Sequence, residues 1–315
     1  SVIFTKDEII KTMDTTNNGI KIEFNTMPTL SKIEKKEPLK DILSNIEGKK
    51  IIYVGESHNN FSHHLNQLRV IKSLHESGKK VSIAMEMFQK PFQKDLDEYI
   101  EGKTTLDEFL KNSQYFKRWK FDYNLYKPII DYAKKNKLPI VAMNIDRSIT
   151  KQVSKKGLFS LSEEQKKLLP NIIDQSNLKY KKSLENIFKE HNIPNDTSHK
   201  KSKHTSNITH KLNLDFFYQA QLIWDETMAQ NIDDYMKKNK NRTLVVIVGS
   251  GHIENHDGIP ARVYKRNNLP YKVILNDLQI SKVGDIVIKN KTTSKIQEEN
   301  RLGTYLKNNF DMTVL

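Results

Sequence analysis

Two copies of a Gly-x-x-His pattern are the residues of this chain whose types and spacing could do chemistry. Residues 55–58 read Gly-Glu-Ser-His, and residues 249–252 read Gly-Ser-Gly-His. An imidazole can bind a metal or move a proton, and a carboxylate beside it, such as Glu56, tunes both abilities. The glycine that opens each copy lets the backbone turn sharply and approach a ligand closely. The pattern therefore predicts two ligand-facing histidines, His58 and His252.

Each copy follows an apolar, β-branched run, 51–54 before the first and 244–248 before the second. Short runs of this kind predict buried strands of a parallel sheet. Two more runs, 81–85 and 140–143, predict two further strands. Ligand sites in open α/β sheets lie beyond the carboxyl ends of the strands. We therefore expect the polar residues that follow these four runs to gather at one edge of the sheet.

The residues expected at that edge combine carboxylates, imidazoles, an amide and a guanidinium. They are Glu56, His58, Glu86, Asn144, Asp146, Arg147 and His252. Two histidines with a carboxylate suit a divalent metal ion, and a carboxylate beside a histidine equally suits general acid–base catalysis. A third interpretation is a structural polar network, in which Glu86 pairs with Arg147. The spacing leaves all three open.

Helical patterns alternate with these strands, which predicts an α/β fold. We expect a three-layer α/β/α domain with a mostly parallel central sheet and a helical insert. The predicted boundaries are an N-terminal extension over 1–48, the α/β domain over 49–280 and a C-terminal tail over 281–315. Within the domain, the polar segment of about 193–211 offers almost nothing apolar to bury and predicts a mobile insert.

Composition narrows the function further. The chain has no cysteine, which excludes disulfides, thiolate metal sites and cysteine nucleophiles. Its net charge is +14, from 52 Lys plus Arg against 38 Asp plus Glu. The lysines come in scattered pairs rather than in one stripe with aromatic residues, so we expect a solvated surface and no nucleic-acid partner. Phosphate-loop, dinucleotide-fingerprint, zincin and nucleophile-elbow motifs are all absent from the sequence.

Six motifs in order resemble the ChaN-like haem-binding family of the Tiki superfamily. They are residues 55–58 with 63–67, residues 84–88 with 92–93, Tyr126 with Pro128, residues 142–144, residues 220–229, and residues 249–252 with 258–260. The resemblance covers roughly residues 50–265. It implies a non-enzymatic haem carrier or store in bacterial iron acquisition.

The resemblance also implies partners and a location. It implies homodimerisation on haem binding, with two haems stacked face to face, and a bacterial lipoprotein of the periplasm, outer membrane or cell surface. We expect the membrane anchor to have been removed or trimmed, because the sequence begins at Ser1. It further implies a tyrosine as the ligand of the haem iron, a donor that suits ferric haem.

We predict Tyr218 as that ligand, with His210, Arg147 and Asn144 as further cofactor-binding residues. The wider superfamily contains metal-dependent peptidases and esterases. The alternative function is therefore a metal-dependent hydrolase, in which a divalent ion is held by Glu56, His58, Glu86 and His252 and activates water. A scaffold whose polar cluster does no chemistry is the third possibility.

Overall fold

The computed structural model describes residues 13–16, 19–22, 46–191, 213–254 and 256–276. Two compact units are present within the chain, one formed by residues 1–144 with 228–315 and the other by residues 145–227. Each is described by itself. We call them the sheet unit and the helical unit. The boundaries predicted at residues 48 and 280 remain predictions.

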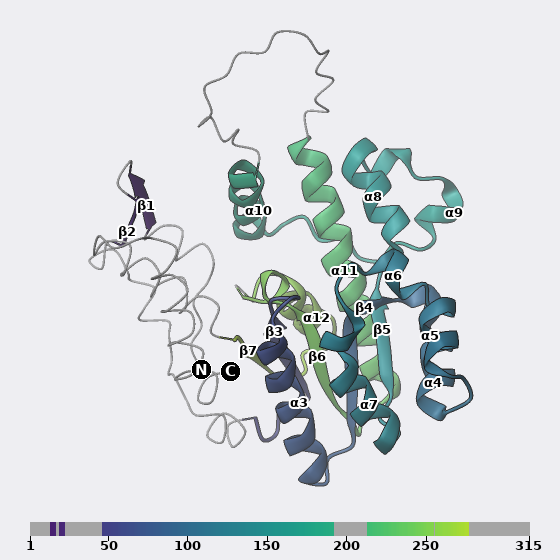
Figure 1. Ribbon diagram of the computed structural model, residues 1–315. Helices are drawn as coiled ribbons and strands as arrows, with labels where there is room; N and C mark the ends of the chain where they lie inside the picture. The colour runs from purple at the N-terminus through teal and green to yellow at the C-terminus, as the bar shows by residue number, and fades with distance from the viewer. Residues whose placement is uncertain (1–12, 17–18, 23–45, 192–212, 255, 277–315) are drawn as a thin grey trace, which may run out of the picture. The chain divides into compact units, whose positions relative to one another are not determined.

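A five-stranded sheet with order β5-β4-β6-β3-β7 is the centre of the sheet unit (Figure 1). Every neighbouring pair of its strands is parallel. The strands are β3 (Ile51–Glu56), β4 (Val81–Gln89), β5 (Ile140–Asn144), β6 (Thr243–Gly249) and β7 (Tyr271–Ile274). Strands β3 to β6 are buried along their whole length, which is why they read as continuous apolar runs rather than as alternating patterns.

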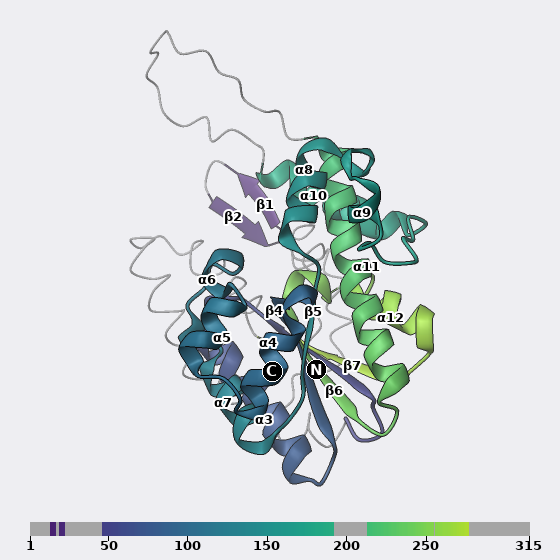
Figure 2. The same cartoon turned by 90° about the vertical axis from the view of Figure 1, so that its right-hand side faces the viewer.

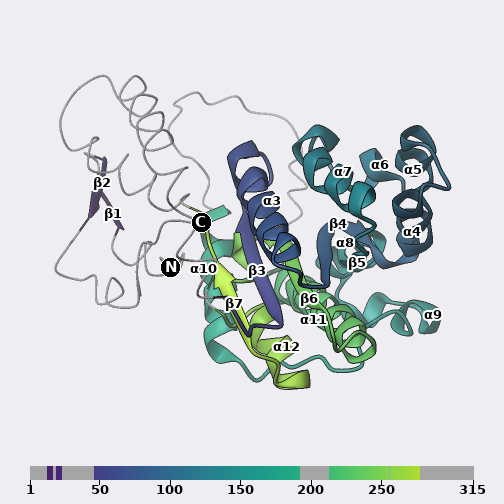
Figure 3. The ribbon, with the colours of Figure 1, turned by 90° about the horizontal axis from the view of Figure 1, so that it is seen from below.

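Helices cover both faces of this sheet, as the view along the sheet in Figure 3 shows. On one face lie α3 (Phe61–Glu76), α4 (Gln93–Glu101) and α7 (Lys127–Asn136). On the other lie α12 (Ile259–Asn267) and the carboxyl-terminal part of α11 (Leu214–Lys238). In α11, Asn231 donates to the backbone oxygen of Met143 in β5 at 2.8 Å. The predicted three-layer α/β/α fold is confirmed.

Shorter elements complete the sheet unit. They are η3 (Lys90–Phe92), α5 (Leu106–Asn112), α6 (Tyr115–Arg118), η4 (Tyr123–Leu125) and η6 (Ser250–His252). Thr105 and Glu108 form a capping box at the start of α5, where each side chain accepts from the other residue's backbone N–H. Local side-chain chemistry therefore fixes where this helix begins.

The helical unit contains α8 (Arg147–Lys156), η5 (Leu158–Ser160), α9 (Glu163–Lys166), α10 (Leu178–His191) and the amino-terminal part of α11. Figure 2 shows these helices beside α11. Apolar residues of α8 and α11, among them Ile149, Val153 and Ile223, form one of its clusters. Tyr180 and Leu184 of α10 form a second with Tyr218 and Leu222 of α11.

Several sequence-based predictions meet the structure differently. The second strand extends to Gln89, beyond the predicted end at residue 85, so Glu86 lies inside β4 rather than after it. The reason is that the apolar run resumes with Met87 and Phe88, both buried. The pairing of β4 with β5 shifts register between Met85 and Gln89.

The N-terminal segment contains an antiparallel pair, β1 (Met13–Thr16) and β2 (Gly19–Ile22). The predicted insert of about 193–211 and tail of 281–315 lie outside the described residues. Among the residues that are described, no helix is long and apolar enough to cross a membrane.

Candidate functional site

Glu56, the last residue of β3, is the centre of a buried hydrogen-bond network. Its carboxylate oxygen Oε1 lies 2.7 Å from His58 Nδ1 and accepts from the Tyr126 hydroxyl at 3.0 Å. Its other oxygen, Oε2, accepts from Gln67 Nε2 at 2.9 Å and lies 3.0 Å from His64 Nδ1. Four side chains from three parts of the sheet unit thus converge on one carboxylate.

The electrostatics of this network make Glu56 a permanent anion. Burial raises the pKa of its carboxyl group, but the hydrogen bonds and positive charges of His58 and His64 outweigh burial and lower the pKa to about 2. An ionised carboxylate can only accept hydrogen bonds, so Nδ1 of each histidine is the donor.

His64 is placed to donate from both ring nitrogens, as an imidazolium ion does. Its Nδ1 donates to Glu56, and its Nε2 lies 3.2 Å from the backbone oxygen of His58, which can only accept. Only a protonated histidine donates from both nitrogens. Burial lowers the pKa of His64, yet the hydrogen bond and charge of Glu56 outweigh it and leave the pKa raised. Glu56 and His64 form a buried ion pair.

His58 differs because it is partly open to solvent, with 26% of its side chain exposed. Its ring lies edge-on to Trp119, with ring centroids 4.8 Å apart, and 4.9 Å from the ring of Phe121. Burial lowers the pKa of His58, but the hydrogen bond to Glu56 and the charge of Glu86 raise it further than burial lowers it. When this ring is neutral, its proton is on Nδ1 and its lone pair is on Nε2.

A second carboxylate–histidine pair lies on the neighbouring strands. Glu86 Oε1 is 3.6 Å from His252 Nε2, and Glu86 Oε2 accepts from the backbone N–H of Gly249 at 2.8 Å. Asn144 Nδ2 donates to the backbone oxygen of Glu86 at 2.8 Å. Burial raises the pKa of Glu86, but the charge and hydrogen bond of His252 outweigh it and hold the pKa below its usual value.

Gly249 is where the two pairs meet. It lies opposite Glu56 in the β3–β6 register. A Cβ atom at this position would lie 3.1 Å from His58 Nε2 and 3.5 Å from Glu86 Oε2. The glycine therefore lets the His58 ring pack closely against the backbone of β6, where the Cβ of any other residue would crowd it.

The structure brings five predicted site residues together in the sheet unit: Glu56, His58, Glu86, Asn144 and His252. The others belong elsewhere. Arg147 is an exposed residue at the start of α8 in the helical unit. Tyr218 is 5% exposed and packs in the helical unit against Tyr180, with ring centroids 6.3 Å apart. His210 lies outside the described residues.

Four residues of the site were not predicted as site residues from the sequence: His64, Gln67, Trp119 and Tyr126. Tyr126 meets Glu56 from 70 positions away, a separation that no local pattern reveals. His64 and Gln67 left a usable signal, because their three-residue spacing places both on one face of α3. Because α3 follows β3 directly, this face of the helix lies against Glu56 at the end of the strand.

A divalent-metal site was the predicted alternative for these carboxylates and histidines. Within the ranges that the structure describes, no group of three or more histidine, aspartate or glutamate side chains is arranged to hold a metal ion. Both oxygens of Glu56 already accept hydrogen bonds from other side chains. These side chains, as folded, are arranged to transfer a proton or to offer one imidazole to a metal, rather than to bind one ion with several ligands.

Fold and site together define a class: a parallel three-layer α/β protein with a buried Glu–His centre at the carboxyl edge of its sheet. The profile of the haem-binding uptake family of the Tiki superfamily, ChaN, matches residues 42–263. The chain belongs to this family.

Individual relatives are more distant. The structure of Campylobacter jejuni ChaN, described as binding haem cofacially, superposes with a TM-score of 0.55 at 16% identity, covering 75% of this chain and 84% of that one. A mutant erythromycin esterase, EreC, in its open conformation gives a TM-score of 0.42 at 13% identity, covering 81% of this chain and 73% of that one.

A curated plant relative is similar in sequence. The chloroplastic protein RETICULATA-RELATED 5 of Arabidopsis thaliana is 24% identical over 234 residues. That match covers 69% of this chain but only 29% of the plant protein's length. Among these comparisons, the superposition on Campylobacter jejuni ChaN shows that the two chains share a fold.

Proposed function

We propose that this protein binds haem for uptake or storage, with His58 as the ligand that the sheet unit offers to the haem iron. One observation carries the proposal. The Nδ1 of His58 donates to the ionised Glu56, which directs the lone pair of the neutral ring to Nε2. A histidine held by a carboxylate in this way is oriented and made more basic as a metal ligand.

The surroundings of His58 fit a porphyrin. A porphyrin needs flat apolar contacts, and Trp119 and Phe121 flank the imidazole. Phe116, in the same segment, is 66% exposed and offers a further aromatic ring to a ligand. The family to which the chain belongs is one of haem-binding uptake proteins, which supports the same ligand.

Charged residues of that segment suit the rest of the ligand. Lys117 and Lys120 are exposed on either side of Arg118 and Trp119. Haem carries two propionate groups, and ammonium groups beside an aromatic surface would pair with them. When bound, haem supplies an iron centre that accepts axial ligands. The protein's own part is to present an oriented imidazole and to cover the porphyrin with aromatic rings.

The tyrosine prediction gives a second candidate ligand. Tyr218 would have to leave its contacts with Tyr180 and Leu222 to reach an iron, because it is buried in the helical unit. Arg147 and His210 remain proposed contacts of the cofactor. Asn144 has its amide engaged with the Glu86 backbone, so we assign it the positioning of β4.

Assembly and location follow the family resemblance as proposals. We propose that haem binding promotes a homodimer, in line with the cofacial haem binding described for Campylobacter jejuni ChaN. We also propose a bacterial lipoprotein of the periplasm, outer membrane or cell surface, held on the membrane through a lipid anchor.

Titration with ferric haem tests the proposal. Absorbance of the full chain should saturate with a Soret band, and sedimentation velocity run on the same samples reports the dimer. His58→Ala should abolish or weaken saturation by at least about tenfold, a change of about 1.4 kcal/mol. Tyr218→Phe should leave it within about twofold. The opposite ranking would assign the iron to Tyr218, and a flat titration of the unaltered chain would refute haem binding.

A second candidate function is ester or amide hydrolysis by acid–base catalysis. Two Glu–His pairs at the carboxyl edge of the sheet favour it, because His58 Nε2 could accept a proton from water while Glu56 stabilises the resulting imidazolium. A panel of p-nitrophenyl esters tests it. Hydrolysis by the unaltered chain that is lost in both Glu86→Gln and His58→Ala would support this function. If the unaltered chain and both variants hydrolyse the esters at equal rates, the function is excluded for this substrate class.

A further inference from the structure

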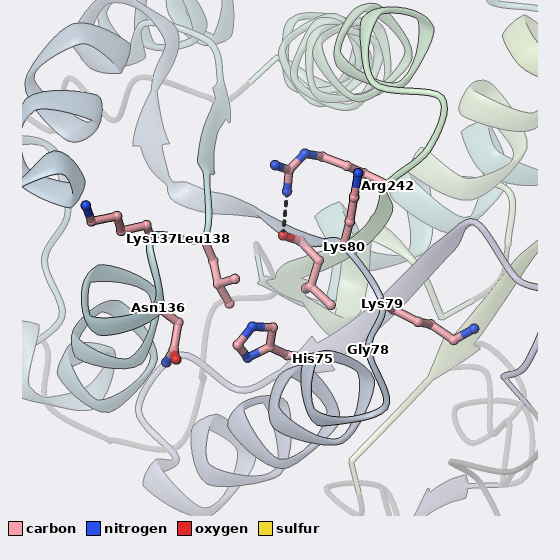
Figure 4. Close-up of a pocket in the computed structure, with 9 residues that line it drawn as sticks. His75, Gly78, Lys79, Lys80, Asn136, Lys137, Leu138 and Arg242 are labelled. Atoms are coloured by element: carbon pink, nitrogen blue, oxygen red, sulfur yellow. Dashed lines mark hydrogen bonds between the residues drawn. The ribbon is translucent and has the colours of Figure 1, made fainter.

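A basic cavity lies at the edge of the sheet opposite to the Glu–His centre (Figure 4). It is bounded where α3 and α7 end and where β4, β5 and β6 begin, and its volume is about 320 Å³. Parallel strands place their amino ends together at one edge and their carboxyl ends at the other. The cavity is therefore separate from the site of Glu56 and His58.

Its lining is strongly cationic. Lys79, Lys80, Lys137 and Arg242 line it together with His75. None of the nine lining residues is an aspartate or glutamate. In Figure 4, Arg242 and Lys80 lie close together at the starts of β6 and β4, while Lys79 and Lys137 extend outward at opposite sides of the cavity rim. Four permanent positive charges around one small cavity repel each other unless an anion is present.

Helix ends do not account for these charges. The carboxyl ends of α3 and α7 each carry a dipole charge of only about −0.5, roughly −1 in total against four full positive charges. The backbone also satisfies its own carbonyl groups there. Gly78 N–H donates to His75, and Leu138 N–H donates to Ala133 at 2.8 Å. A net charge of about +3 is left in the cavity.

Several of its donors are held in place rather than mobile. Arg242 Nη1 donates to the backbone oxygen of Val81 at 3.0 Å and lies 3.3 Å from the Ser82 hydroxyl. The Tyr132 hydroxyl lies 2.8 Å from His75 Nδ1, and Asn136 Nδ2 donates to the Tyr132 backbone at 2.9 Å. A guanidinium fixed by one nitrogen can present its remaining N–H groups to a tetrahedral anion.

We propose that this cavity is a binding site for a phosphate-class dianion, either free or as the headgroup of an acidic phospholipid. Its volume admits a phosphomonoester or pyrophosphate group, and its fixed guanidinium with three lysines supplies bidentate and point-charge contacts to phosphate oxygens. The site does not depend on haem binding at the opposite edge of the sheet.

The test uses the full chain and two double variants. Lys79→Gln/Lys137→Gln removes two charges from the cavity. Lys94→Gln/Lys111→Gln removes two charges from exposed positions on α4 and α5, which are not among the lining residues. Calorimetric titration with inorganic phosphate and with pyrophosphate, at about 0.15 M salt to screen diffuse attraction, measures the free anion. Flotation with phosphatidic acid vesicles against phosphatidylcholine vesicles measures the lipid.

We expect the cavity variant to bind at least about tenfold more weakly, a change of about 1.4 kcal/mol, and the control variant to bind within about twofold of the unaltered chain. Loss confined to the vesicle experiment would assign the site to lipid headgroups, and loss confined to calorimetry would assign it to free phosphate. Equal weakening in both variants, or no binding of any probe by the unaltered chain, would overturn the proposal. Arg242→Lys, which keeps the charge but loses the guanidinium fork, should also weaken binding.

Discussion

Replacing Glu56 with glutamine should destabilise the sheet unit by about 2–4 kcal/mol. The substitution preserves the volume of the side chain but removes the negative charge that four neighbouring side chains contact. Removing one partner of a buried ion pair typically costs about 3–5 kcal/mol. The lowered pKa of Glu56, about 2 against an ordinary 4.5, points to about 3 kcal/mol at about 1.36 kcal/mol per pKa unit. Because glutamine keeps one acceptor oxygen, we expect the lower part of that range.

The loss should depend on pH with a definite sign. At pH 5.5 both His58 and His64, whose pKa values are raised in the fold, are positively charged and paired with Glu56. As the pH rises through their raised pKa values, both rings lose their protons, and the charge–charge part of their contact with Glu56 is lost. The loss in free energy of unfolding caused by Glu56→Gln should therefore be larger at pH 5.5 than at pH 9, by about 1 kcal/mol or more.

Urea unfolding followed by tryptophan fluorescence measures this loss. The chain has two tryptophans, so a Trp224→Phe background leaves Trp119, beside His58, as the reporter of the sheet unit. Glu98→Gln is the matched control, because Glu98 makes an exposed ion pair with Lys94 at 3.7 Å and should cost under about 0.5 kcal/mol. A loss below about 1 kcal/mol for Glu56→Gln, or equal losses at both pH values, would refute the assigned ion pair.

Three further predictions concern the same site. Gly249→Ala should destabilise the fold by about 1–3 kcal/mol and weaken haem binding, because its Cβ would lie 3.0 Å from His58 Cε1. Gly251→Ala is the control, because a Cβ at that position meets nothing within 4 Å. Unfolding curves and haem titrations of both variants measure the difference. Tyr126→Phe should cost about 1–2 kcal/mol in urea unfolding, since a donor 3.0 Å from a buried carboxylate is lost. Haem affinity should rise from pH 6 to pH 8 as His58 loses the proton that its raised pKa retains, and a titration series that shows the reverse slope would contradict His58 as the ligand.

Much of the fold could be predicted because its signals are local. In α11, Leu214–Lys238, apolar residues recur at helical spacing, a pattern that predicts a helix from the sequence. The capping boxes at Thr105 and Ser162 are both present. Buried parallel strands are equally legible, since both faces of β3 and β6 are covered and nearly every residue must be apolar.

The site was only half predictable for the opposite reason. The sequence places Glu56, His58, Glu86 and His252 at strand ends, because a parallel sheet brings those ends to one edge. It does not reveal that Glu56 and Glu86 each take their own histidine, 2.7 Å and 3.6 Å away. Side-chain partners of this kind depend on tertiary contacts, as Tyr126 shows, and a pattern of types and spacings does not contain them.

Tyr218 as the iron ligand remains a prediction, and it shows what a motif leaves out. Its neighbours Ala220 and Gln221 fit a family motif, but the motif says nothing about exposure. In the structure the ring packs against Tyr180 and Leu222 in an apolar cluster. His58, chosen for chemistry at a strand end, is the residue with an accessible ring and a fixed tautomer.

The most direct test of the central claim is electron–nuclear double resonance on ferric haem bound to protein labelled with ¹⁵N-histidine. If His58 Nε2 binds the iron, a strong ¹⁵N coupling should be present in the unaltered chain and in Tyr218→Phe, and absent from His58→Ala. A spectrum without any histidine ¹⁵N coupling, or one that His58→Ala leaves unchanged, would contradict the assignment of His58 as the haem ligand.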